Sequence, residues 1–190
     1  MYYRKNIDKS ISKTKILASG GPLQIELVDY VGSDDNDVLI KISESLVEIY
    51  GPAARLTGNT IKTYFNREGS IPFISRLQGE IIGYMIGVPL ETLNREPWAR
   101  VDTNFNKFNT IYTYAFVMQS EHQGKGHSKI LKKIYLNHIK KQPSIVYVTG
   151  HVRKGIASRF TGKISIIEEI ENWQGTGEAF EYYRRELDLH

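Results

Sequence analysis

The chain has 190 residues, of which 41% are hydrophobic and 24% charged, a composition typical of one globular domain with a sizeable core. It contains no cysteine, which excludes a disulfide framework and a thiol nucleophile and favours a reducing, cytoplasmic location. The net charge of +4 does not by itself indicate a nucleic-acid partner, and no apolar run approaches the roughly 18 residues that span a bilayer.

The beginning of the chain predicts an arm followed by one domain. Residues 1–21 are polar and basic and end in glycines, which predicts an N-terminal leader arm before a single domain of residues 22–190. Residues 23–28 alternate apolar and polar, as in a strand with one buried face. Apolar residues then recur at helical spacing up to Tyr50, after Ser33-Asp34-Asp35, which can cap a helix. A shorter helix is expected over residues 59–67.

The middle and the end of the chain predict further strands. Residues 71–77 and 81–88 are apolar runs separated by three residues, which predicts a β-hairpin. The polar connection of residues 89–109 is longer than a linker needs, so we expect it to contact a substrate. It contributes Glu91 and Trp98 as candidate substrate residues, and Asp102 as a further carboxylate that could attract a cation. Two closing strands are expected around the turn at residues 174–178, a second wall of the substrate pocket.

The most informative segment is residues 111–135, which predicts a strand, a polar turn and an amphipathic helix. Ile111–Met118 is apolar or aromatic almost throughout, as in a strand buried on both faces. Gly124 and Gly126 allow the backbone to approach an anion closely, and the free N–H groups of the first helical turn point at it. A second strand at residues 144–149 completes a strand–helix–strand unit. The pattern predicts a site for a phosphorylated cofactor, whereas a simple surface loop is the alternative.

The spacing of the turn excludes two nucleotide motifs. A dinucleotide fingerprint needs a glycine where Lys129 stands, and a Walker A loop needs one where Ser120 stands. The remaining pattern, Gln123-Gly-Lys-Gly-His-Ser128, resembles the Gln/Arg-x-x-Gly-x-Gly/Ala signature of the GNAT superfamily of acyl-CoA-dependent N-acyltransferases. Ser128 departs from that signature at its last position. The order of the predicted elements over residues 22–190 also resembles this family.

The resemblance implies an α/β (α+β) fold with a mixed, mostly antiparallel central sheet flanked by helices. A splayed parallel strand pair, residues 111–118 and 144–149, would hold acetyl-CoA. The pantetheine arm would contact the backbone of Phe116, Val117 and Met118, and a backbone N–H near Val117 would polarise the thioester carbonyl. The pyrophosphate would be bound by Gln123, Gly124, Lys125, Gly126, His127 and Ser128.

The usual catalytic groups of that family are missing from their places. The cofactor strand has no acid, and Ser158 or Phe160 stands nearest to the position of the usual tyrosine. By elimination, Tyr114 and His151 are candidate catalytic residues, with Tyr112 and Glu91 as alternatives, although packing explains the two tyrosines and backbone bonding explains the histidine as well. The five histidines show no ligand spacing with carboxylates, so no metal is expected. Four lysines are expected on the solvated face of the helix: Lys132, Lys133, Lys140 and Lys141.

Together these features predict an N-acetyltransferase that transfers an acetyl or other short acyl group from acetyl-CoA to a primary amine. The alternative is a catalytically silent acyl-CoA-binding sensor or regulatory module, which the missing acid and tyrosine favour. The expected partners are acetyl-CoA and an amine acceptor, either a small molecule or a protein. Neither a membrane nor a nucleic acid is expected, and a homodimer is left open.

Overall fold

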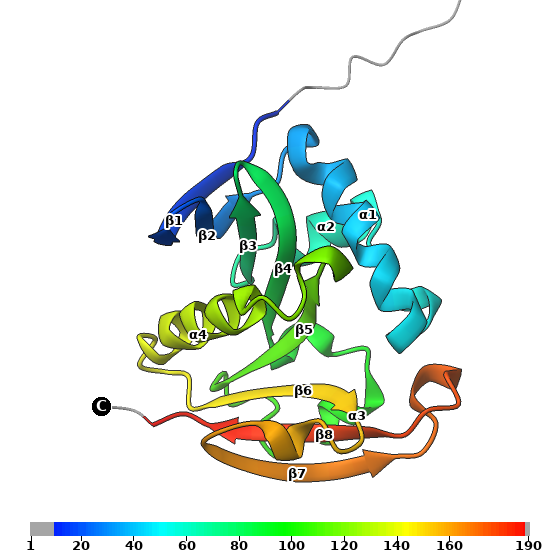
Figure 1. Ribbon diagram of the computed structural model, residues 1–190. Coiled ribbons are helices and arrows are strands. Elements are labelled where there is room, and N and C mark those ends of the chain that lie inside the picture. The colour runs from blue at the N-terminus through cyan, green and yellow to red at the C-terminus, as the bar shows by residue number, and fades with distance from the viewer. Residues whose placement is uncertain (1–9, 189–190) are drawn as a thin grey trace, which may run out of the picture.

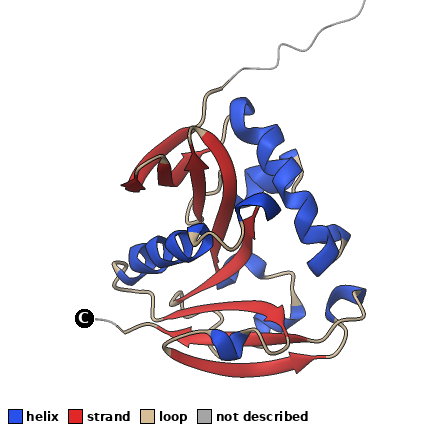
Figure 2. Ribbon diagram, in the orientation of Figure 1, coloured by secondary structure: helices blue, strands red, loops and turns tan. Residues whose placement is uncertain are grey.

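The computed structural model describes residues 10–188, which form an eight-stranded sheet with helices on both faces (Figures 1 and 2). The strands follow one another across the sheet in the order β1-β2-β3-β4-β5-β6-β8-β7. Within the described residues every neighbouring pair is antiparallel except β5 and β6, which are parallel. The strands are β1 (Lys13–Gly20), β2 (Leu23–Tyr30), β3 (Ile71–Leu77), β4 (Glu80–Pro89), β5 (Thr110–Met118), β6 (Tyr147–Arg153), β7 (Lys163–Ile170) and β8 (Phe180–Glu186). This architecture confirms the predicted fold class.

The helices lie on opposite faces of the sheet (Figure 1). They are α1 (Ser33–Tyr50), α2 (Gly58–Tyr64), α3 (Pro97–Arg100) and α4 (His127–Lys140), with short 3-10 turns at η1 (Pro52–Ala54), η2 (Leu90–Leu93), η3 (Ser120–His122), η4 (Ala157–Arg159) and η5 (Trp173–Gly175). The helices α1 and α2 cover one face of the central strands, and α4 covers the other. No helix within residues 10–188 is long and apolar enough to cross a membrane.

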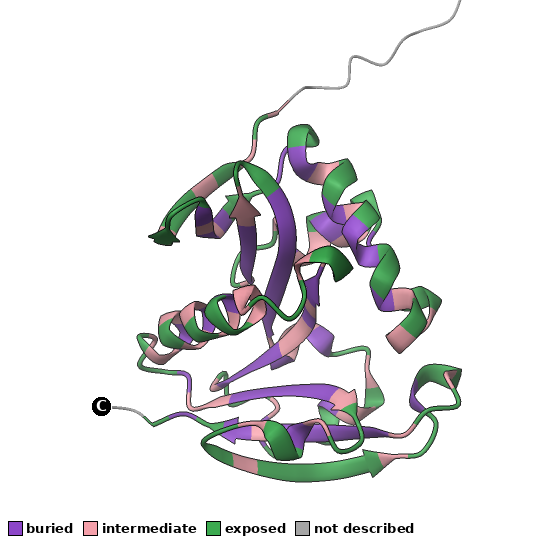
Figure 3. Cartoon of the chain, in the orientation of Figure 1, coloured by how far each residue is buried: buried purple, intermediate pink, exposed green. Residues whose placement is uncertain are grey.

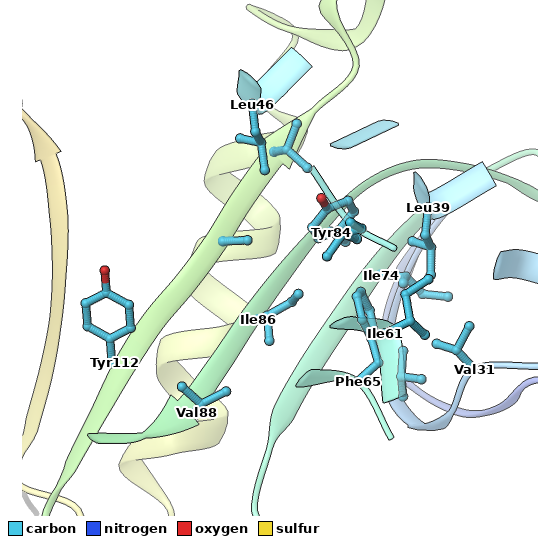
Figure 4. Close-up of a cluster of buried hydrophobic side chains, with 14 of the residues drawn as sticks. Val31, Leu39, Leu46, Ile61, Phe65, Ile74, Tyr84, Ile86, Val88 and Tyr112 are labelled. Atoms are coloured by element: carbon cyan, nitrogen blue, oxygen red, sulfur yellow. The ribbon is translucent and has the colours of Figure 1, made fainter. Parts of the chain in front are cut away.

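Two hydrophobic cores hold these layers together, one on each face of the sheet. The first joins α1 and α2 to β4 and β5, with Leu39, Phe65 and Tyr84 almost fully buried (Figure 4). The second seats Leu131, Tyr135 and Ile139 of α4 against β3, β4 and β5. These three residues recur at helical spacing, which explains why one stripe of α4 is buried and the rest is not. Burial is greatest along β3 and β4, whereas both faces of the edge strand β7 are largely exposed (Figure 3).

The predicted leader arm is wrong for residues 13–20. These residues form β1, which pairs with β2 at the edge of the sheet. The segment before β1 is docked as well, since the Ser12 hydroxyl donates to the Asp34 carboxylate at 2.9 Å. The helix α1 is capped by Gly32 without a side-chain hydrogen bond, so the expected side-chain cap at residues 33–35 is also wrong. Residues 1–9 of the predicted arm lie outside the described residues.

The strands β5 and β6 separate soon after they begin, as Figure 1 shows. They pair only where Thr110–Tyr112 faces Tyr147–Thr149. On its other side, β5 contains a bulge at Tyr114, because Thr113 and Ala115 pair with successive residues of β4. A bulge bends a strand, and β6 continues alongside β8 instead of β5. The predicted splayed parallel pair is therefore present, although β6 begins three residues later than expected and extends past His151.

Candidate functional site

A cavity of about 390 Å³ lies where β5 and β6 separate. Its lining residues belong to both faces of the sheet: Tyr64 and Tyr114 come from the core under α1 and α2, while Phe116 belongs to the core under α4. The cavity therefore passes through the gap between the two strands. Because the strands stop pairing at Tyr112, the gap exposes backbone groups of β5 to an occupant of the cavity.

The loop between β5 and α4 has the conformation that the motif predicts. Gly124 and Gly126 have φ of 72° and 86°, in the left-handed region that favours glycine, and Gly126 is the N-cap of α4. Among the described residues, no backbone N–H from Gly124 to Lys129 donates a hydrogen bond, and Ile130 is the first to do so. These free donors lie at the positive end of a helix of 14 residues, an arrangement that binds phosphate groups.

The predicted loop residues divide into two groups. Gln123 is already hydrogen-bonded inside the protein. Its side-chain amide donates to the Met118 carbonyl at 2.9 Å, and its backbone N–H donates to the Ser120 carbonyl. It braces the loop against the end of β5. The remaining predicted residues, Gly124, Lys125, Gly126, His127 and Ser128, surround the free N–H groups, and Lys125 is exposed.

The three residues predicted to contact pantetheine lie at the end of β5. The Phe116 side chain lines the cavity. The side chains of Val117 and Met118 are buried in opposite cores, so only their backbone can meet a ligand. Both are paired with β4 on one side and have no strand partner among the described residues on the other.

His151 lies inside β6 and lines the cavity, not beyond the strand as the sequence suggests. Its ring stacks on those of Trp173 and Tyr182, with ring centroids 3.8 Å and 4.7 Å away. Its Nδ1 is hydrogen-bonded to the Tyr112 hydroxyl at 3.0 Å, whereas Nε2 is buried without a partner in the described part of the chain. Burial lowers the pKa of His151 to about 3. The imidazole is therefore neutral at physiological pH and is a weak base.

Tyr114 also lines the cavity, on the opposite side of the gap. Its ring stacks on Tyr64 with the centroids 3.8 Å apart. Burial, together with the neighbouring Tyr64, raises the pKa of Tyr114 well above its usual value of 10. The phenol therefore stays protonated, and it can donate a hydrogen bond but releases its proton only with difficulty.

The long connection supplies one of its two predicted substrate residues. Trp98 lines the cavity, and its ring lies 4.9 Å from that of Tyr112. Glu91 is not among the cavity-lining residues, and its Oε1 accepts a hydrogen bond from the Phe108 N–H at 3.0 Å. Glu96 lines the cavity instead. Nothing in the sequence separates Glu96 from Glu91, because both lie in the same polar connection and only the fold of η2 and α3 distinguishes them.

The turn at residues 174–178 and Asp102 were also predicted to belong to the pocket, and the structure supports only the first. Trp173 and Gln174, at the start of the predicted turn, line the cavity as a wall. Asp102 is fully buried away from it, and its carboxylate accepts hydrogen bonds from Tyr182 and Arg184 of β8. The expectation that Asp102 attracts an amine is wrong, because this charge is already paired inside the protein.

Lys132 differs from the expectation of a solvated helix face. It is half-buried, it lines the cavity, and its Nζ lies 3.5 Å from the centroid of the Phe160 ring. Lys133, the next residue, is exposed as expected. Among the described residues, no group of three or more His, Cys, Asp or Glu side chains is arranged to hold a metal ion.

Comparisons with known proteins identify the fold. No family model and no curated protein matches the chain. Among solved structures, the chain is similar to the ribosomal-protein-S18-alanine N-acetyltransferase from Escherichia coli, with a TM-score of 0.60 and 12% identity over 88% of this chain and 96% of that one.

Two further solved structures are also similar in fold to this chain. NAA60 from Arabidopsis thaliana, solved with a bisubstrate analogue, has a TM-score of 0.63 and 12% identity over 87% of this chain and 99% of that one. The yncA protein from Salmonella typhimurium, solved with its cofactor acetyl-CoA, has a TM-score of 0.62 and 16% identity over 89% of this chain and 96% of that one. Identities this low show the fold alone, and that fold is the one common to GNAT N-acetyltransferases.

Proposed function

We propose that this chain, which has the GNAT fold, is an acyl-CoA-dependent N-acyltransferase that transfers an acetyl or other short acyl group to a primary amine. The observation that carries the proposal is an arrangement along β5. A loop of free N–H groups at the start of α4 lies at the end of β5, and the gap between β5 and β6 contains a cavity. Such an arrangement suits a long ligand with phosphate at one end and a reactive group at the other.

The residues present fit acetyl-CoA. The N–H groups of residues 124–129 would bind the pyrophosphate, with Lys125 adding a positive charge. The unpaired edge of Phe116–Met118 would bind the amides of pantetheine as an added strand does. A backbone N–H near Val117 would polarise the thioester carbonyl, since it belongs to a rigid, buried strand.

The part of the cavity on the α1 side indicates the kind of acceptor. Its walls are aromatic, with Tyr64 and Trp98 on one side of the gap and Trp173 on the other. Among the described residues that line the cavity, Glu96 is the one carboxylate. Aromatic faces and a carboxylate together favour a cation carried on an apolar body. Two buried polar atoms of cavity-lining residues, His151 Nε2 and Trp98 Nε1, have no hydrogen-bond partner in the described residues. We therefore propose a small amine with an apolar or aromatic body.

An assay of thiol release with a panel of amines tests the function. Purified protein with acetyl-CoA should release CoA faster with 2-phenylethylamine than with a polyamine or a lysine-containing peptide. Mass spectrometry of the products should show the amide. Calorimetric binding of acetyl-CoA without release of CoA from any amine would contradict the enzyme and support the sensor instead.

Glu96→Gln should raise the KM for the amine about tenfold and leave the affinity for acetyl-CoA unchanged, because the charge lost faces the acceptor side of the cavity. Steady-state kinetics at saturating acetyl-CoA measure the effect. Glu48→Gln, an exposed position on α1, is the matched control. An unchanged KM in Glu96→Gln would remove Glu96 from acceptor binding.

The low pKa of His151 predicts the pH dependence. A group with a pKa of about 3 does not change its charge between pH 6 and 8, so it produces no inflection there. At subsaturating amine, the rate should instead climb with pH through this range, because the fraction of neutral amine increases.

His151→Phe keeps an aromatic ring in the stack between Trp173 and Tyr182 and should lower the rate by less than about tenfold. A general base contributes roughly 10²–10⁴. A fall of about a thousandfold, with the acetyl-CoA affinity intact, would make His151 the base.

A further inference from the structure

Lys132 occupies an unusual position for a lysine. It lies on α4 about one and a half turns after the phosphate loop, on the side of the helix that faces the cavity. Tyr135, one turn further along, is hydrogen-bonded through its hydroxyl to the Thr113 side chain at 3.3 Å. Thr113 is the first residue of β5 beyond its pairing with β6, so this face of α4 lies over the start of the gap.

Within residues 10–188, the charge of Lys132 has no counter-ion. In the described part of the chain, its Nζ makes no ion pair and no hydrogen bond with another side chain, and it lies over the face of the Phe160 ring. The nearby groups that carry or can acquire charge are Arg185 and Tyr183 on β8, with Tyr135 and the exposed Lys129 on its own helix. Burial and the positive charge of Arg185 lower the pKa of Lys132 to about 8. A half-buried cation beside another cation is unfavourable unless a ligand compensates it.

We propose that Lys132 is the residue that protonates the sulfur of CoA as it leaves. This role rests on the proposed acyl transfer. The neutral amine nitrogen forms a bond to the thioester carbonyl carbon, and the carbon–sulfur bond breaks with its electron pair passing to sulfur. The sulfur takes a proton from the Lys132 ammonium, giving the free thiol. The proton that the amide nitrogen loses then restores the ammonium through water.

Acid strength favours Lys132 over the tyrosines of the cavity. An ordinary thiol has a pKa of about 8.5, so an ammonium with a pKa of about 8 gives up its proton to a thiolate with no large cost. Burial raises the pKa of Tyr183 to about 12 and that of Tyr114 further. Proton transfer from Tyr183 to a thiolate would therefore be strongly uphill. Phe160, the residue over which Lys132 lies, has no proton to give.

Two substitutions at this position test the role. Lys132→Met keeps an unbranched apolar side chain but removes the ammonium group and its proton, whereas Lys132→Arg keeps the charge but holds its proton. Both should lower kcat about a hundredfold, and both should change the Kd for acetyl-CoA by less than about threefold. In the wild-type protein, kcat should fall above about pH 8, because the active form of Lys132 is protonated; Lys132→Arg should abolish that fall. Lys133→Met, at the adjacent exposed position, is the matched control and should behave as the wild type does.

Three results would overturn the assignment, provided that thermal unfolding shows the variants to be folded. The first is a kcat within about threefold of wild type in Lys132→Arg, and the second is an alkaline fall that persists in that variant. The third is weakened acetyl-CoA binding with kcat unchanged at saturation, which would make Lys132 a binding residue only. Absence of CoA release from the wild type with every amine is a different failure, since it removes the proposed function and this role with it.

Discussion

Replacing Gly126 by aspartate should weaken acetyl-CoA binding by more than about tenfold, a loss above about 1.4 kcal/mol. Gly126 is the N-cap of α4, and a side chain added there would meet no protein atom within 4 Å. The protein therefore has room for the new carboxylate. Its negative charge would lie at the positive end of the helix, where the pyrophosphate is expected to bind, so it would compete with the phosphates for the same N–H groups.

The matched control is Gly126→Asn, which has nearly the same shape as aspartate without the charge. Both residues tolerate a positive φ better than other side chains do, so the conformational cost at φ 86° is similar in the two variants. Calorimetric titration of acetyl-CoA into both should show a much larger loss for aspartate. Unchanged affinity in a folded Gly126→Asp protein would show that the loop is not the phosphate site. Equal losses of affinity in the two variants would show that the change in backbone conformation, and not the charge, weakens binding.

Most of the sheet and the conformation of the loop between β5 and α4 were predictable because their signals are local. The apolar run of β5, the two glycines and the amphipathic pattern of α4 are contiguous in the sequence, so the strand, the turn and the helix can be read from one short segment. The edge strand β1 was missed because it is largely exposed, so its residues lack the apolar periodicity that marks a buried strand. These residues form a strand because they pair with β2, and the sequence of β1 alone does not show that pairing.

The chemistry of the cavity was less predictable because it depends on which side chains the fold brings together. The sequence places Lys132 among helix lysines that are expected to be solvated. In the fold, Phe160 from the segment after β6 and Arg185 of β8 lie beside it. His151 has an ordinary pKa in isolation, and the low value arises from burial among Trp173 and Tyr182, which are distant in sequence. Such pairings leave no periodic pattern in a single sequence.

Asp102→Ala should lower the free energy of unfolding by about 3–5 kcal/mol, although Asp102 does not line the cavity. Its side chain has no exposed surface, and its carboxylate accepts a hydrogen bond from the Tyr182 hydroxyl at 2.6 Å. It also binds Arg184 Nη2 at 2.7 and 2.8 Å, and it accepts the Asn104 N–H at 2.7 Å. Alanine would leave the Arg184 charge and the Tyr182 hydroxyl without a partner in a largely buried place, and that desolvation is the main cost.

The substitution should also disturb the cavity. Asp102 links the connection that contains Trp98 to β8, and Tyr182 of β8 stacks on His151. Chemical denaturation should give the change in free energy, and the melting temperature should fall by about 6–20 °C, given about 2–4 °C for each kcal/mol in a chain of this size. Glu186→Ala, at the end of β8, removes the exposed ion pair with Lys163 of β7 and should cost less than about 1 kcal/mol. A loss below about 1 kcal/mol in Asp102→Ala would contradict the prediction, since it would mean that water or a rearranged side chain satisfies Arg184 once the carboxylate is gone.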